Sequence, residues 1–229
     1  CARLLRPNAE LIGYDENFTI CDRNDQVKML RTIIKDLNYN DRVDASEMSS
    51  YISYLKNMMI GPSQFEKDMN RPDYPPVRVY YEYQEQLPYE NKMDFGDLIR
   101  NTAIMLERNK NLREHYQDRF RYILVDEYQD TNHAQYQVTN MLAGGHKNLC
   151  VVGDDAQSIY SFRGADISNI LNFKQDYPDA KQVPLEQNYR STKAILQCAD
   201  AVIKQNTQQL DKSLWTSNDF GDTITLLEN

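Results

Sequence analysis

The second half of the chain alternates between short apolar runs and helical patterns, which restricts its fold to few architectures. Apolar runs rich in β-forming residues predict strands at residues 122–125, 149–152 and 182–185. Helical spacing of apolar residues predicts helices at residues 133–142, 167–173 and 192–204. Strands that alternate with helices in this way are typical of a parallel sheet with crossover helices. The sequence therefore predicts an α/β fold for this half.

The first of these predicted strands ends abruptly in two carboxylates, Asp126 and Glu127. At the end of a buried parallel strand, such residues lie at the carboxyl edge of the sheet, where ligands bind. Two neighbouring acids there can divide the work of nucleotide hydrolysis. One can hold Mg²⁺, usually through water, while the other orients or deprotonates the attacking water. The alternative is that both acids are simply solvated.

The second predicted strand runs into a loop that carries a glycine, a glutamine and aromatic residues. Gly153 permits a tight turn at the sheet edge, and Gln157 is placed to reach toward whatever the two acids bind. Tyr160, Phe162 and Arg163 offer aromatic faces and a cation, a combination suited to stacking on single-stranded bases. The alternative is a strand-to-loop turn whose aromatic side chains simply pack.

The third predicted strand is followed by Tyr189 and Arg190, just before a helix begins. The planar guanidinium of Arg190 can donate two hydrogen bonds to a phosphate, and Tyr189 can stack on a base. Taken alone, an arginine in this position is more often a surface arginine. The three successive strand ends together predict a site for a nucleoside triphosphate beside a site for a nucleic-acid strand.

The first part of the chain, from residue 21 to about residue 90, is predicted to be helical and is rich in tyrosine. Capping patterns and apolar spacing mark where its helices begin. The stripe of methionine and tyrosine is interpreted as core and surface packing rather than as a cofactor site. The expected helix starts are Asp22, Asp44 with Glu47, Ser63 with Glu66, Val77 and Asp94, and residues 71–76 (RPDYPP) are expected to be a rigid break.

Composition excludes several classes of function. The 229 residues include 26 basic and 34 acidic side chains, and the resulting net charge of −8 argues against a wholly basic nucleic-acid coat. The four cysteines form no CxxC pair and the three histidines lack metal-ligand spacing, so we expect no zinc site and a reduced, cytoplasmic setting. No apolar run approaches membrane-spanning length, and no signal peptide is visible. Both ends, a helical pattern at residues 1–6 and an apparent strand at 223–227, are expected to continue in a larger protein.

Several motifs give the chain a resemblance to a known family. It resembles the superfamily 1 DNA helicases of the UvrD, Rep and PcrA type along essentially its whole length. The longest matches are VDEYQDTN at residues 125–132, GDDAQSIYSFRGA at 153–165 and LEQNYRS at 185–191, which are similar to the family's motifs II, III and IV. Shorter matches are CARLLR at 1–6, DFGDLI at 94–99 and LWT at 214–216.

The resemblance implies a 3′-to-5′ ATP-driven DNA translocase with two RecA-like domains and inserted helical subdomains. Residues 1–92 would form an inserted helical subdomain, residues 93–182 the sheet-bearing part of the first RecA-like domain, and residues 183–229 the start of the second. The implied partners are single-stranded and duplex DNA, the remaining helicase domains of a parent protein, and accessory repair or replication proteins, with no membrane.

The resemblance also implies a role for each residue at the strand ends. Asp126 would serve Mg²⁺, and Glu127 would be the general base for water. Gln157 would sense the γ-phosphate of ATP, and Arg190 would reach that phosphate from the second RecA-like domain as an arginine finger. Two further roles are assigned by position: Tyr189 would stack on the adenine, and Tyr160, Phe162 and Arg163 would contact single-stranded DNA.

The chain departs from the family pattern at several points. Ala156 stands where many relatives have aspartate, Phe162 where many have tryptophan, and Gly96 where the sequence DFDDL is usual. No GxxxxGK[ST] phosphate-binding loop occurs in the chain. We therefore expect the 229 residues alone to lack appreciable ATPase activity. Two other readings stay open: a non-enzymatic DNA-binding module on the same scaffold, and the helicase subunit of a helicase–nuclease complex.

Overall fold

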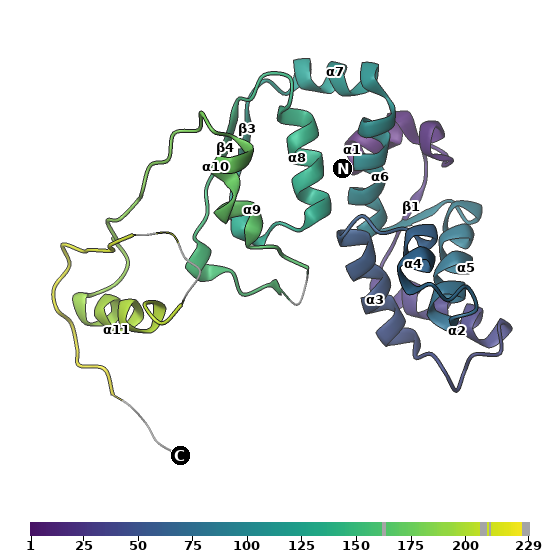
Figure 1. Ribbon diagram of the computed structural model, residues 1–229, viewed down its shortest axis with the longest axis horizontal. Helices are drawn as coiled ribbons and strands as arrows, with labels where there is room; N and C mark the ends of the chain where they lie inside the picture. The colour runs from purple at the N-terminus through teal and green to yellow at the C-terminus, as the bar shows by residue number, and fades with distance from the viewer. Residues whose placement is uncertain (162–163, 207–209, 211, 226–229) are drawn as a thin grey trace.

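The computed structural model describes residues 1–161, 164–206, 210 and 212–225 (Figure 1). Its first part consists mainly of helices, joined by one pair of short strands. The helices are α1 (Ala2–Leu5), the 3₁₀ helix η1 (Arg6–Ile12), α2 (Arg23–Asp36), α3 (Ala45–Asn57), α4 (Pro62–Met69), α5 (Pro75–Tyr89), α6 (Phe95–Arg108) and α7 (Lys110–Arg119).

Most of the expected helix starts in this part are confirmed. The side chains of Asp22, Asp44 and Asp94 each accept backbone N–H hydrogen bonds from the first turn of the following helix. The start at Ser63 is wrong, because Pro62 occupies the first position of α4. Likewise α5 begins at Pro75 rather than Val77. Proline suits a first helical position because the missing N–H has no partner there in any case.

The expectation that this part is all-helical is wrong at one place. Strand β1 (Thr19–Cys21) pairs in parallel with β2 (Lys92–Asp94), with Thr19 opposite Lys92. The two strands are short and far apart in the sequence, so the local pattern of neither one indicates the pairing. The hydrophobic side chains of this part form two buried cores. One lies within residues 21–87, and the other joins residues 5–18 to Met93, Leu98 and Met105.

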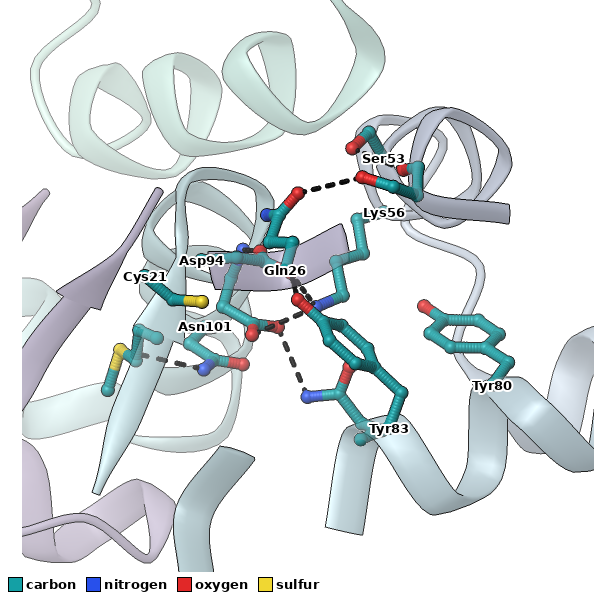
Figure 2. A network of polar contacts seen from close by, with 12 residues as sticks. Cys21, Gln26, Ser53, Lys56, Tyr80, Tyr83, Asp94 and Asn101 are labelled. Atoms are coloured by element: carbon teal, nitrogen blue, oxygen red, sulfur yellow. Dashed lines mark hydrogen bonds and ion pairs between the residues drawn. The ribbon is translucent and has the colours of Figure 1, made fainter. Parts of the chain in front are cut away.

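A buried cation connects the helical group α2–α5 to α6 (Figure 2). Lys56 of α3 is fully buried, and its Nζ lies 2.6 Å from Asp94 Oδ2 and 2.9 Å from Asp97 Oδ2. The Tyr83 hydroxyl donates to the same Asp94 oxygen at 3.0 Å. Gln84 donates to Asp97 at 3.1 Å. The buried charges of Lys56, Asp94 and Asp97 are thus paired across α3, the end of β2 and the first turn of α6.

Gly96, one of the departures from the family pattern, lies directly beside this cation. A Cβ atom added at Gly96 would lie 3.0 Å from both Cβ and Cδ of Lys56 and 3.3 Å from Asp94 Oδ1. Since ion pairs fix the Lys56 side chain at its far end, it has little freedom to move aside. The close approach of α3 to the first turn of α6 thus explains a glycine at this position.

The second part of the chain contains the predicted parallel strands. Strand β3 (Ile123–Val125) pairs in parallel with β4 (Leu149–Val151), with Val125 opposite Val151, which confirms two of the three strands within one residue at each end. The strands are not buried on both faces, because Leu124 is 78% exposed and its neighbour Cys150 is also exposed. The remaining elements are the 3₁₀ helices η2 (Tyr128–Asp130) and η3 (Asp155–Gln157), and α8 (His133–Ala143), α9 (Ser168–Leu171), α10 (Phe173–Asp176) and α11 (Lys193–Ile203).

The third predicted strand, at residues 182–185, is wrong: the structure describes these residues in no strand. Pro184 lies in the middle of the run and has no N–H to donate to a ladder, and Val183 and Leu185 are exposed. The backbone instead pairs later, where Gln187 forms a parallel bridge with Trp215. Residues 223–225, the described part of the other expected strand, are not in a strand either.

Helix packing connects the helical group to the second part of the chain. Helix α6 packs against both α3 and α8, which also contact each other, and α8 follows β3 in the chain (Figure 1). The helix predicted at 167–173 is divided into α9 and α10 at Asn172. Helix α11 lies apart from the other helices in Figure 1. No helix among the described residues is long and apolar enough to cross a membrane.

Candidate functional site

The two acids that follow β3 are open to solvent. Asp126 and Glu127 are both exposed, directly after the half-buried Val125. Asp126 Oδ1 accepts a hydrogen bond from the N–H of Glu127 at 3.0 Å, and no described residue hydrogen-bonds its Oδ2. Glu127 has a φ of 49°, in the left-handed region that residues with a side chain rarely occupy. Both carboxylates are therefore accessible to a ligand at the carboxyl end of the strand.

A buried glutamine connects these acids to the loop after β4. Gln129 has no exposed surface, and its Nε2 donates to Glu127 Oε2 at 2.8 Å. Its Oε1 accepts the N–H of Asp154 at 3.0 Å, and its backbone carbonyl accepts the Ser158 hydroxyl at 3.3 Å. One amide side chain thus fixes the orientation of Glu127 relative to the neighbouring strand end.

Gln157 lies at the end of this loop, in η3. Its side chain is exposed, and its Nε2 donates to Asp154 Oδ2 at 2.7 Å. No described hydrogen bond joins Gln157 directly to Asp126 or Glu127. The connection runs through intermediates: Gln157 to Asp154, Asp154 to Gln129, and Gln129 to Glu127. Ladder bonds from Val152 and Tyr128 continue past the strands and hold the two ends together.

Close packing requires a glycine at position 153, where the loop after β4 begins. A substitution there provides a first test of the site. A Cβ atom at Gly153 would lie 2.6 Å from Gln129 Oε1, 2.8 Å from Ile170 Cδ1 and 3.2 Å from the Tyr128 nitrogen. Because Gln129 is buried and bonded at both ends of its amide, it cannot rotate away without losing a hydrogen bond. We expect Gly153→Ala to lower the free energy of unfolding by about 1–3 kcal/mol, measured by urea denaturation.

Gly144→Ala is the matched control for that substitution. Gly144 has helical dihedral angles, and the nearest atom to an added Cβ, the Asn140 carbonyl oxygen, is 3.1 Å away. Gly144→Ala should therefore lower the free energy of unfolding clearly less than Gly153→Ala does. Equal stability of the Gly153→Ala variant and the wild type would contradict the packing described for this loop.

The predicted DNA-contacting residues follow η3, and only part of this group is described. Tyr160 is half-buried, and its carbonyl accepts the N–H of Ala165 at 3.3 Å. Phe162 and Arg163 lie outside the described residues, so their predicted role stays a prediction. Gly164 follows with a φ of 84°, a value that favours glycine.

Tyr189 and Arg190 are both exposed, and no described contact joins them to the acids. The Tyr189 hydroxyl donates to Gln187 Oε1 at 2.8 Å, and 76% of its surface is accessible. The backbone N–H of Arg190 donates to Asn188 Oδ1 at 3.0 Å. Among the residues that the structure describes, the Arg190 guanidinium has no hydrogen bond or ion pair with Asp126 or Gln157. Its predicted place opposite the acids therefore stays a prediction.

The donor set at the end of β3 is compatible with a magnesium ion bound together with a nucleotide. Within the described ranges, no group of three or more histidine, cysteine, aspartate or glutamate side chains forms a metal site of its own. Mg²⁺ in nucleotide sites is typically held by one or two carboxylates, with phosphates and water as its other ligands. Asp126 has one carboxylate oxygen that no described group uses, and it is exposed. One such carboxylate fits that manner of binding.

Comparison with known families identifies the chain. Residues 1–178 match the model of the UvrD/REP helicase N-terminal domain, which is well over half of the chain. The chain belongs to the UvrD/REP helicase family. Residues 183–229 match the UvrD-like helicase C-terminal domain.

Individual members of the UvrD/REP helicase family match along the whole chain. The ATP-dependent DNA helicase PcrA of Staphylococcus epidermidis is 47% identical over 230 residues, which cover 100% of this chain and 32% of that protein. PcrA of Staphylococcus aureus is 47% identical over 236 residues, again with 100% of this chain and 32% of the relative covered. The chain spans about a third of the length of these curated relatives.

Two residues that organise this UvrD/REP site, Gln129 and Asp154, are not among those predicted from the strand ends. Gln129 lies in η2, and Asp154 directly precedes η3. The available signal was their place inside the motifs, since VDEYQDTN contains Gln129 and GDDAQSIYSFRGA contains Asp154. Only the folded chain shows that they bond each other and join Glu127 to Gln157.

Proposed function

We propose that the chain is part of an ATP-dependent 3′-to-5′ DNA helicase that couples ATP hydrolysis to unwinding of duplex DNA in repair or replication. The whole-chain match to PcrA helicases supports the activity. The main structural support for the proposed nucleotide site is a chain of hydrogen bonds from Glu127 through Gln129 and Asp154 to Gln157. This chain connects the ends of the two adjacent strands β3 and β4. Single-stranded and duplex DNA are its substrates, and the remaining helicase domains and accessory repair or replication proteins are its partners in the cytoplasm.

The proposed architecture is a RecA-like fold with an inserted helical subdomain. Residues 1–92 form the inserted subdomain, residues 93–182 the sheet-bearing part of the first RecA-like domain, and residues 183–229 the start of the second. The parallel pairing of β3 with β4 supports the RecA-like part. The separate core within residues 21–87 supports a helical unit in the first segment. The packing of residues 5–18 on Met93, Leu98 and Met105 is consistent with that segment being joined to α6.

In the proposed reaction, Glu127 takes a proton from the water that attacks the γ-phosphorus of ATP, and ADP leaves. The hydrogen bond from Gln129 orients the Glu127 carboxylate for this task. Asp126 would hold Mg²⁺, which when bound neutralises developing charge on the phosphates. The carboxylate pair thus divides two tasks between a base and a metal ligand.

Gln157, Arg190 and Tyr189 complete the nucleotide site in this proposal. Gln157 senses the γ-phosphate with its exposed amide. Arg190 stabilises the transition-state charge as an arginine finger, an effect of about 10³–10⁵ in rate in related phosphoryl-transfer enzymes. Tyr189 stacks on the adenine, and its large exposed surface supports that role.

Single-stranded DNA is proposed to contact Tyr160, Phe162 and Arg163, the segment that follows Gln157 in the chain. Aromatic stacking tolerates any base sequence, as a translocase requires. Because this segment is continuous with η3, DNA contact and the γ-phosphate sensor would share one loop.

The proposal is tested by comparing the full-length protein with the 229-residue chain. We expect full-length protein to hydrolyse ATP faster when single-stranded DNA is added, and to unwind a duplex with a 3′ tail but not one with a 5′ tail. The 229-residue chain should have no measurable ATPase, because it contains no GxxxxGK[ST] loop to bind the β- and γ-phosphates. Full-length protein without DNA-stimulated ATPase would contradict the proposed function, and turnover by the short chain would contradict its inactivity.

A further inference from the structure

A lysine from the segment after α11 reaches the loop that carries Gln157. Lys212 Nζ lies 2.9 Å from Asp155 Oδ1 and also donates to Asp154 Oδ1. Two residues earlier, the N–H of Leu210 donates to Asp155 Oδ2 at 2.9 Å. The side chains of Lys212 and Asp155 are only 21% and 3% exposed. The segment is thus fixed on the loop by two side-chain contacts and one backbone contact.

The Asp154 carboxylate is shared between this lysine and Gln157. Its Oδ1 accepts from Lys212 and from the N–H of Ala156, while its Oδ2 accepts from Gln157 Nε2 at 2.7 Å. Partial burial works to raise the pKa of Asp154, but hydrogen bonds from Lys212 and Gln157 outweigh it, and the pKa lies below its usual value. Asp154 therefore stays ionised near neutral pH and can hold both partners at once.

The same segment is bonded to the residues that precede Arg190. The N–H of Trp215 donates to the Glu186 carbonyl at 3.0 Å, and the N–H of Asn188 donates to the Trp215 carbonyl at 2.8 Å. The N–H of Ser213 donates to the Glu186 side chain at 3.1 Å. Leu210 and Lys212 therefore contact the Gln157 loop, while Ser213 and Trp215 contact residues 186–188, directly before Tyr189 and Arg190.

We propose that Lys212 is a positioning residue that couples the loop of Gln157 to the segment of Arg190. It acts through Asp154, which orients the Gln157 amide. The inference rests on the proposed function, since it assumes that Gln157 and Arg190 meet the γ-phosphate of ATP. A displacement of residues 212–215 would then be transmitted to Gln157, so that the two halves of the nucleotide site respond together.

The contacts of Lys212 differ from those of an ordinary surface lysine. Lys204 lies shortly before Lys212 in the sequence and pairs with Asp200, one helical turn away. The side chains of Lys204 and Asp200 are 69% and 43% exposed. Such exposed pairs contribute little to stability, because water screens both charges. Lys212 instead pairs with two carboxylates distant in sequence, one of them buried. Lys204 therefore provides a matched control.

The first test measures ATPase kinetics of full-length variants. We expect Lys212→Met to lower the DNA-stimulated kcat about tenfold, a typical size for coupling between sites, while the KM for ATP changes less than about twofold. Lys212→Arg keeps the cation and should recover most of the loss. Lys204→Met should behave as wild type. Normal stimulation in Lys212→Met, or failure of arginine to rescue it, would overturn the proposal.

A second variant separates this inference from the proposed function. Gln157→Ala should also lose DNA stimulation. If Gln157→Ala loses it and Lys212→Met does not, only the role of Lys212 fails. If Gln157→Ala behaves as wild type, the sensor role proposed for Gln157 fails, and the inference fails with it.

The last test measures tryptophan fluorescence and so requires no enzymatic activity. Trp215 is the single tryptophan of the 229-residue chain and therefore reports on this segment alone. Loss of the Lys212 anchor should free the backbone around Trp215, so Lys212→Met should increase quenching of its fluorescence by acrylamide. Lys212→Arg and Lys204→Met should match the wild type, with circular dichroism confirming that all variants are folded. Identical quenching in Lys212→Met and the wild type would show that the lysine does not hold this segment.

Discussion

Glu127→Gln is expected to reduce the kcat of ATP hydrolysis in the full-length protein by about 10²–10⁴-fold, while ATP binding changes little. The glutamine side chain has the same shape and can still accept the hydrogen bond from Gln129 Nε2, but it cannot take a proton from water. Steady-state ATPase assays with saturating DNA measure kcat, and titration with a fluorescent ATP analogue measures affinity. The substitution therefore separates proton transfer from binding.

Glu114→Gln is the control for this variant, since Glu114 lies on α7 and its side chain is 55% exposed in a pair with Lys110. Its ATPase should equal that of the wild type. DNA-dependent ATPase at the wild-type rate in Glu127→Gln would remove the catalytic assignment of Glu127. If both ATP binding and turnover are lost in Glu127→Gln, the carboxylate has a structural role instead.

The second large effect concerns stability rather than catalysis. Lys56→Met is expected to lower the free energy of unfolding of the chain by about 3–5 kcal/mol, because it leaves Asp94 and Asp97 buried without their cation. Urea denaturation monitored by circular dichroism measures the change. The control is Lys28→Met: Lys28 pairs with Asp25 at 3.7 Å, the side chains are 74% and 54% exposed, and the loss should be small. Comparable losses in the two variants would contradict the account of this cluster.

The pH dependence of the Lys56→Met variant provides an independent check. Burial raises the pKa of Asp97, and Lys56 acts against that rise. Without the lysine, the pKa of Asp97 in the folded state should rise further above its value in the unfolded chain. The folded variant then binds the proton more readily, so it should regain stability as the pH falls from neutrality. The same pH dependence in variant and wild type would contradict this.

This cluster matters for the site because of what it connects. Lys56 joins α3 to the start of α6, and α6 packs against α8, the helix that follows the acidic strand end. The helical group is thereby anchored to the part of the chain that carries Asp126 and Glu127. Lys56 could not be recognised from the sequence, because a lone lysine in a helical pattern gives no sign of burial.

Local signals in the sequence predicted the local structure well. The apolar runs before Asp126 and Gly153 predicted β3 and β4, and the side chains of Asp22, Asp44 and Asp94 predicted three helix starts. These predictions succeed because strand ends and helix caps depend on a few neighbouring residues.

Features that depend on distant residues were not predictable in this way. The β1–β2 pair joins segments on either side of four helices. The contacts of Gln129 and Lys212 likewise depend on tertiary structure. The error at residues 182–185 is of another kind, because Pro184 within the run is itself a local signal against a strand. Sequence identified which side chains would follow the strands, whereas the bonds that orient them required the folded chain.

In the proposed site, Asp126, Glu127 and Gln157 face one nucleotide, with Arg190 on its other side. A crystal structure of the full-length protein with Mg²⁺ and a non-hydrolysable ATP analogue tests this arrangement most directly. We expect Asp126 beside the metal ion, Glu127 within hydrogen-bond reach, about 3 Å, of the attacking water, and Gln157 and Arg190 at the γ-phosphate. An analogue bound away from the ends of β3 and β4, or these four side chains directed to separate regions, would contradict the account.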